Sequence, residues 1–181
     1  MNRVLILYGS TEGQTEKIAY TMRETLHRAG VGCNVVEAGT LTPIVADYSA
    51  IIVAASVHAS RYQRSVEDWV RAHATALNDK PTAFVSVCLG ILQQSDPKVT
   101  AELDAIVRRF TSTTGWNPSI VKQVAGALLY TRYNVFKRWI MKRIAAKAGG
   151  ATDTSRDYEY TDWADVRCFT EDFLSRLPAA A

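Results

Sequence analysis

The chain alternates short apolar runs with longer segments in which apolar residues recur at helical spacing. The short runs are rich in β-branched residues and lack a regular polar alternation, which is typical of strands in a parallel sheet covered on both faces. We predict strands at residues 3–8, 33–37, 50–56, 82–88 and 120–129.

Helices are predicted between and after these strands, where apolar residues recur every three or four positions. The segment 97–110 is the clearest, because Asp96 stands at a capping position and Pro97 at the first helical position. The other predicted helices are 14–29, 65–77 and one beginning at Asp162, while 38–49 holds at most a short helix.

This order of elements predicts the class of fold. Strands that alternate with helices imply right-handed crossovers and a doubly wound α/β sheet, here as a single domain over residues 1–181. In such sheets ligands bind beyond the carboxyl ends of the strands, so we examine the loops that follow the strands for candidate chemistry.

The loop after the first strand, residues 8–15, reads Tyr-Gly-Ser-Thr-Glu-Gly-Gln-Thr and leads into a helix. Unpaired N–H groups and the helix dipole favour an anion at such a place. The loop has no lysine for a nucleoside triphosphate, and its glycines do not have dinucleotide-binding spacing. A cradle for one phosphate monoester, such as that of FMN, fits best; the alternative is a polar turn in which hydroxyls cap the helix.

Residues 8–19 resemble the FMN phosphate loop of flavodoxins. Glu12 stands where many flavodoxins have Ser or Thr, and we expect its side chain to point to solvent. The resemblance implies FMN as cofactor and a flavodoxin-like strand order of 2-1-3-4-5. It also implies three groups of cofactor-binding residues: Ser10, Thr11, Glu12, Gly13, Gln14 and Thr15; Ser56, Val57, His58, Ala59, Arg61 and Tyr62; and Cys88, Leu89 and Gly90.

Flavodoxins hold the flavin ring between the loops after strands three and four. Tyr62 could therefore stack on the ring, and His58 or Arg61 could place a donor or positive charge near its reduced form. The alternative is that Arg61 and Tyr62 begin the next helix at the surface. Cys88 is expected to be a buried thiol at the end of its strand and not a redox participant.

Charge is distributed unevenly along the chain. The 181 residues carry 21 Lys and Arg against 18 Asp and Glu, a net charge of +3. Six of these cations lie between Thr131 and Thr152, where there is no acidic residue, so the rest of the chain has 15 cations and 18 acids. Basicity confined to one segment argues against a broad nucleic-acid-binding surface.

That basic segment is an insert at residues 131–150, after the fifth strand, and it is predicted to be helical. Its aromatic and aliphatic residues share one arc of the helix, as in helices that lie in a membrane interface. It could equally contact a flat, carboxylated ligand, or pack on the domain with its charges solvated. The residues expected to contact substrate or membrane are Arg132, Tyr133, Lys137, Arg138, Trp139, Lys142 and Arg143.

The insert, together with Gly149-Gly150, Thr152-Asp153-Thr154 and Tyr160-Thr161-Asp162-Trp163, resembles the flavodoxin-like, menaquinone-dependent protoporphyrinogen IX dehydrogenases. The resemblance implies oxidation of protoporphyrinogen IX to protoporphyrin IX in heme synthesis, with electrons passed to menaquinone or ubiquinone. It places the chemistry at N5 of the flavin and identifies no catalytic side chain. Residues 90–94 depart from the expected pattern because they are poor in basic residues.

The resemblance further implies a cytoplasmic protein attached peripherally to the inner membrane, and it leaves a homo-oligomer open. Cys33, Cys88 and Cys168 are odd in number and widely spaced, which favours reduced thiols and no metal site. Two other functions remain open at this point: an electron carrier between proteins, and an NAD(P)H:quinone reductase. The basic insert disfavours a carrier, and no nicotinamide site is evident in the sequence.

Overall fold

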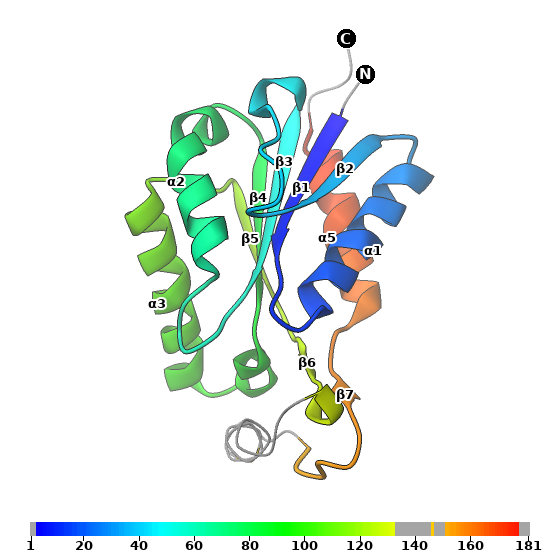
Figure 1. Cartoon of the computed structure of the whole chain (residues 1–181), viewed down its shortest axis with the longest axis vertical. Coiled ribbons are helices and arrows are strands. Elements are labelled where there is room, and N and C mark those ends of the chain that lie inside the picture. Colours follow the sequence, from blue (N-terminus) through cyan, green and yellow to red (C-terminus); the bar gives the residue numbers. More distant parts are fainter. Residues whose placement is uncertain (1–2, 133–145, 147–150, 178–181) are drawn as a thin grey trace.

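The computed structural model describes residues 3–132, 146 and 151–177. Its centre is a five-stranded parallel sheet in the predicted order, β2-β1-β3-β4-β5 (Figure 1). The doubly wound α/β fold is therefore confirmed. The strands are β1 (Arg3–Gly9), β2 (Gly32–Glu37), β3 (Ala50–Ser56), β4 (Thr82–Val87) and β5 (Ile120–Val124).

Two helices cover each face of the sheet (Figure 1). Alternate β1 residues such as Ile6 face the core beneath α1 (Gln14–Arg28) and α5 (Trp163–Ser175). Their neighbours, such as Leu7, face the core beneath α2 (Arg64–Asn78) and α3 (Pro97–Thr114). Burial of both faces explains why the strands read as continuous apolar runs.

The helix boundaries follow from local chemistry. The side chain of Asp96 accepts a hydrogen bond from the Lys98 amide at 2.9 Å, which starts α3 where predicted. Gly115 ends α3 in a left-handed conformation, beyond the predicted end at residue 110. Asp162 caps α5 in the same way. Residues 38–49 contain only a 3₁₀ turn, η1 (Val45–Asp47).

The predicted fifth strand is too long. β5 ends at Val124, and β6 (Ala127–Leu128) pairs antiparallel with β7 (Tyr158–Glu159) in a separate two-stranded sheet. The chain leaves the main sheet after Val124 because residues 160 and 161, which follow β7, bind the next two carbonyls. The Thr161 hydroxyl donates to Ala125 O at 2.7 Å, and the Tyr160 amide donates to Gly126 O at 3.1 Å.

The small sheet lies at the carboxyl end of the main sheet, next to η2 (Leu89–Gln93) and η3 (Tyr130–Arg132) (Figure 1). Leu128 and Tyr130 are buried there, and Leu89, Tyr158 and Tyr160 pack against them. The Tyr130 hydroxyl donates to Ala151 O at 2.8 Å. Both ends of the insert are therefore anchored beside the predicted ligand-binding edge of the main sheet.

Most of the insert lies outside the described residues, and so do the predicted contacts of Tyr133, Lys137, Arg138, Trp139, Lys142 and Arg143. Arg132 is placed only as the last residue of η3. Within the part of the chain that the structure describes, no helix has the length and apolar character needed to cross a bilayer.

Candidate cofactor site

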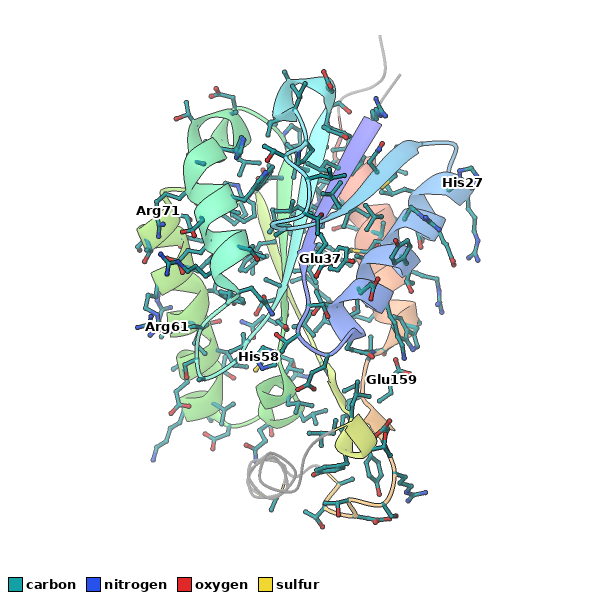
Figure 2. The ribbon with its side chains drawn as sticks, viewed as in Figure 1. His27, Glu37, His58, Arg61, Arg71 and Glu159 are labelled. Atoms are coloured by element: carbon teal, nitrogen blue, oxygen red, sulfur yellow. The ribbon has the colours of Figure 1, made fainter. Side chains whose placement is uncertain are left out.

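A cavity of about 640 Å³ lies at the carboxyl end of the main sheet. It is bounded by the loops after β1, β3 and β4, by one side of α3, and by the start of the small sheet. His58 lies in this region, below the ends of the strands (Figure 2). Pockets for small molecules and cofactors have volumes of about 300–1,000 Å³, so the cavity is of suitable size.

The loop after β1 is shaped by its own polar groups. Gly13 has a φ of 89°, a left-handed conformation that favours glycine, and it provides no side chain to cap α1. Instead, the Gly13 amide donates to the Ser10 hydroxyl at 2.9 Å. This hydrogen bond closes the turn, and the loop presents the start of α1 to the cavity.

Two polar side-chain atoms at the start of α1 are buried without hydrogen-bond partners among the described residues. They are Thr15 Oγ1 and Gln14 Oε1, and both residues line the cavity. An unsatisfied buried polar atom costs about 1–3 kcal/mol, so a ligand that pairs with it recovers that free energy. The Thr15 hydroxyl can donate to a phosphate oxygen, which fits the phosphate monoester of FMN.

Gln63 joins the loops after β1 and β3, and the sequence analysis did not identify it. Its Nε2 donates to Ser56 Oγ at 2.6 Å and to Thr11 Oγ1 at 3.1 Å. A Cβ on Gly9 would lie 2.5 Å from Val66 Cγ2 and 3.0 Å from Gln63 Oε1, so glycine is required for this close approach. Gln63 directly precedes α2, and no local sequence pattern marks it as part of the site.

The predicted residues of the first loop therefore divide into two groups. Ser10, Glu12, Gln14 and Thr15 line the cavity, whereas Thr11 and Gly13 shape the loop. Glu12 is half-buried in the lining, so the expectation that it points to solvent is wrong.

Gln14 also connects the loop after β1 to residues 159–161, which follow the insert in the chain. Its Nε2 donates to Glu159 Oε1 at 2.5 Å and to Thr161 Oγ1 at 2.8 Å. Lys17 Nζ lies 3.9 Å from the same Glu159 carboxylate. The amide nitrogen of Gln14 is thus engaged with β7 and the residues after it, and only its oxygen remains for a ligand.

The loop after β3 makes a tight turn against the cavity. His58 and Arg61 exchange backbone hydrogen bonds of 2.8 and 3.0 Å around Ala59 and Ser60. Both central residues have positive φ, 47° and 61°, as in a type I′ turn. Left-handed conformations at residues other than glycine cost of order 1–3 kcal/mol and often mark ligand-binding loops. Arg109 of α3 donates to Ser60 O and holds this turn in place.

Tyr62 does not reach the cavity, which corrects the expectation that it stacks on the flavin ring. Its side chain is buried against Phe84 and Phe110, with ring centroids 5.0 and 4.9 Å away. Its hydroxyl is 2.8 Å from Ser86 Oγ, and burial raises the pKa of Tyr62 to about 12. The alternative surface position is wrong for Tyr62, because β3 and α2 bring its ring into the core, and it is right for Arg61, which is exposed.

Arg61 also departs from the prediction. Ser56, Val57, His58 and Ala59 line the main cavity as expected, but Arg61 lines a smaller cavity beside it. Figure 2 shows Arg61 displaced from His58 toward α2 and α3.

The loop after β4 contributes Cys88, Leu89 and Gly90 to the cavity, as predicted. The Gly90 amide donates to Cys88 Sγ at 3.3 Å, and burial raises the pKa of the Cys88 thiol. The thiol therefore keeps its proton at neutral pH, and Cys88 is half-buried in the cavity lining rather than fully buried as expected.

One wall of the cavity comes from α3, which the sequence analysis treated only as a packing helix. Val99, Leu103 and Ile106 make this wall apolar, and Glu102 and Arg109 add opposite charges. The residues that line the cavity follow helical spacing, a pattern that equally predicts a face packed on the core. The cavity thus has hydroxyls at one side and an apolar wall at another, which suits a molecule with a phosphate and a flat aromatic ring.

Comparison with known proteins agrees with this geometry. The flavodoxin domain family matches residues 5–155. The chain is similar to a protoporphyrinogen IX dehydrogenase [quinone] of Leishmania major, with 34% identity over 98% of this chain and 77% of that protein. It is similar to the protein of the same name from Escherichia coli K12, with 32% identity over 94% and 93% of the two chains.

Solved structures agree on the fold. Oxidised flavodoxin 1 from Bacillus cereus has a TM-score of 0.60 at 16% identity, covering 98% of this chain and 100% of the flavodoxin. An apo NADH:FMN oxidoreductase has a TM-score of 0.57 at 12% identity, covering 99% and 92%.

Proposed function

This chain belongs to the flavodoxin domain family and, within it, to the quinone-dependent protoporphyrinogen IX dehydrogenases, and on that basis we propose that it oxidises protoporphyrinogen IX and delivers the electrons to a quinone. It is thus an oxidoreductase, and FMN is the cofactor of its fold family, as the sequence predicted. The proposal extends to heme synthesis as the pathway and to a membrane quinone as the acceptor.

The proposal rests on sequence identity of more than 30% over nearly the whole chain. The cavity agrees with it, because its size and lining suit a phosphorylated aromatic cofactor. Hydroxyls at the start of α1 face the same cavity as the apolar side of α3. The aligned range of the Leishmania major protein covers 98% of this chain, at 34% identity.

The residues that would hold FMN lie in the three loops at the carboxyl end of the sheet. When bound, FMN supplies two-electron redox chemistry between a reduced donor and a quinone. Ser10 and Thr15 provide hydroxyls for the phosphate, and the positive end of the α1 dipole favours its charge.

The remaining lining positions the reactants and limits access of water. Val99, Leu103 and Ile106 form an apolar wall, and Leu89 continues it from the loop after β4. Gln63 holds the loops after β1 and β3 together, and Arg109 holds the turn at Ser60. Cys88 keeps its proton at neutral pH because burial raises its pKa, so it adds no negative charge to the lining.

The insert is proposed to bring the enzyme to the cytoplasmic face of the inner membrane, where menaquinone or ubiquinone is dissolved. Support comes from composition: six cations and no acidic residue lie between Thr131 and Thr152. Anionic lipid attracts each such cation by about 1 kcal/mol near the surface. Both ends of the insert lie beside the cofactor cavity, so such attachment would bring that cavity close to the bilayer.

The test is anaerobic turnover of the purified, FMN-loaded protein with a menaquinone acceptor. Protoporphyrinogen IX and NADPH are supplied separately as donors, and porphyrin fluorescence and quinone reduction are followed. The proposal predicts quinone reduction with protoporphyrinogen IX and none above background with NADPH. Turnover with NADPH alone would identify a reductase, and turnover with neither donor would leave an electron carrier.

A further inference from the structure

A second cavity of about 180 Å³ lies beside the cofactor cavity and has a different chemical character. The two cavities share Ser60, Ile106 and Arg109 in their linings, so they meet at the turn after β3. Since a water molecule takes about 30 Å³ in the liquid, the smaller cavity has room for a short side arm of a ligand.

Two arginines line this smaller cavity from different elements, and both are exposed. Arg61 comes from the turn after β3, and Arg109 comes from α3. Among the described residues, neither has a carboxylate within salt-bridge distance, whereas the nearby Arg64 and Arg71 on α2 are paired with acidic residues of their own helix. Among the described residues, the Arg109 guanidinium donates one hydrogen bond, to Ser60 O, and its other N–H groups can donate to a ligand.

Among the described residues, Glu67 is the one acidic residue that lines this smaller cavity, and its negative charge is paired with an arginine outside the lining. Glu67 Oε1 lies 2.5 Å from Arg71 Nη2, and Asp68 binds the same guanidinium at 3.1 Å. Tyr62 and Phe110 form an aromatic floor of this cavity, and the Tyr62 hydroxyl is hydrogen-bonded to Ser86. The smaller cavity is therefore cationic, with an apolar floor, and suits a carboxylate on a hydrocarbon arm.

Away from Arg109, the main cavity is less suited to a carboxylate of the substrate. Glu102 lines it, and Arg109 is the one arginine or lysine among the described residues in its lining. Glu102 and Arg109 are seven positions apart on α3, which corresponds to about 10 Å along the helix. An anionic substrate in the main cavity would thus be drawn toward the Arg109 end and repelled from the Glu102 end.

From this geometry we infer that Arg61 and Arg109 form a subsite for a carboxylate of the substrate, which orients that substrate against the cofactor. The inference rests on the proposed function, because protoporphyrinogen IX carries propionate groups of this kind. A planar guanidinium group binds a carboxylate through two parallel hydrogen bonds, so the two arginines can fix the orientation of the substrate as well as attract its negative charge. Arg61, predicted to serve the flavin, is thereby assigned to the substrate.

The test compares binding of protoporphyrin IX and its dimethyl ester to the FMN-loaded protein, by fluorescence titration. The ester keeps the ring and removes the charges. The wild-type protein is expected to bind the diacid about tenfold more tightly than the ester, a preference that ~0.5 M salt reduces because the site is exposed. Arg61→Gln, at a residue outside the lining of the main cavity, is expected to reduce this preference while its affinity for the ester and for FMN is unchanged. The R61Q/R109Q variant is expected to lose the preference in titrations at saturating FMN, because Arg109 also holds the turn at Ser60.

Matched variants separate charge recognition from other effects. Arg108→Gln removes the same charge from the same helix, at a position outside both linings, and should keep the full preference. Arg109→Lys keeps the charge and should keep a preference for the diacid, whereas Arg109→Gln should lose most of it. Turnover of Arg61→Gln with the two reduced substrates should show the same loss of preference in KM.

Several outcomes would overturn the subsite. They are equal wild-type affinity for diacid and ester, equal loss for both ligands in R61Q/R109Q, the same loss in R108Q, or weakened FMN binding in Arg61→Gln. The proposed function is judged separately, by turnover. A protein that prefers the diacid through these arginines but fails to oxidise protoporphyrinogen IX would refute the proposed activity and leave the subsite standing.

Discussion

Thr15 is the residue whose chemistry most directly indicates a bound phosphate. Its hydroxyl is buried at the start of α1 and has no partner among the described residues. Thr15→Val removes only that hydroxyl, so FMN affinity should fall about tenfold, measured by quenching of flavin fluorescence. The apoprotein should unfold at the same or a higher urea concentration, because an unsatisfied polar atom has been removed.

Thr25→Val provides the matched control for this prediction. Thr25 is buried on the same helix, but its hydroxyl donates to Thr21 O at 2.9 Å. The control should leave FMN affinity unchanged and should not stabilise the apoprotein. A Thr15 variant that binds FMN like the wild-type protein would refute the role given to this hydroxyl.

Tyr62 provides a test of a corrected assignment. Its pKa is raised to about 12 by burial, against about 10 in the unfolded chain. Because the folded-state pKa is the higher one, the stability from the neutral hydroxyl is complete below pH 10 and is lost as pH rises toward 12. Tyr62→Phe should make the free energy of unfolding fall less steeply over that range, in urea titrations at fixed pH values.

The same variant should leave the flavin site intact. Tyr62 lies outside the lining of the main cavity, so FMN affinity and the flavin absorption spectrum of Tyr62→Phe should match those of the wild-type protein. A clear change in that spectrum would mean that the ring stacks on the flavin after all, as the sequence suggested.

Single residues were the hardest level to predict from the sequence. The hydroxyls of the first loop could be assigned because a strand, two glycines and a helix follow one another directly. Tyr62 and Gln63 could not, because their directions depend on how α2 leaves the turn at Ala59 and Ser60. That turn uses left-handed conformations at residues other than glycine, which no composition rule anticipates.

The link between α1 and β7 is the main feature at the scale of elements. Gln14 Nε2 donates to both Glu159 and Thr161, so the cofactor loop and the return from the insert share hydrogen bonds. In a double-mutant cycle of Gln14→Leu and Thr161→Val, the coupling free energy of unfolding should be about 0.5–1.5 kcal/mol. Strictly additive effects in urea unfolding would show that the two segments are independent.

Element boundaries were predicted where local chemistry sets them. Asp96 and Asp162 start α3 and α5 by capping, and both positions are visible in the sequence. The end of β5 is set instead by Tyr160 and Thr161, which bind the carbonyls of Gly126 and Ala125 from far along the chain. The apolar pattern continues through this break, so the sequence predicted one long strand.

At the scale of the whole molecule, the insert should separate cofactor binding from use of a membrane quinone. Replacing residues 133–148 with a short Gly-Ser linker should leave FMN affinity within about twofold, because the described residues that line the cavity are all retained. Co-sedimentation with anionic vesicles and oxidation of protoporphyrinogen IX by vesicle-bound menaquinone should both be lost.

A charge variant refines this prediction. Neutralising Lys137, Arg138 and Lys142 together should weaken binding to anionic vesicles by roughly 3 kcal/mol at low salt and have little effect on neutral vesicles. Unchanged turnover with vesicle-bound quinone after deletion of the insert would refute its membrane role.

The central claim is that protoporphyrinogen IX reduces a flavin held at the carboxyl end of the sheet. The most direct measurement is anaerobic rapid mixing of the FMN-loaded protein with protoporphyrinogen IX in the absence of quinone. The account predicts loss of oxidised-flavin absorbance in step with formation of oxidised tetrapyrrole, followed by recovery when menaquinone is added. Flavin that stays oxidised with protoporphyrinogen IX but is bleached by NADPH would contradict it.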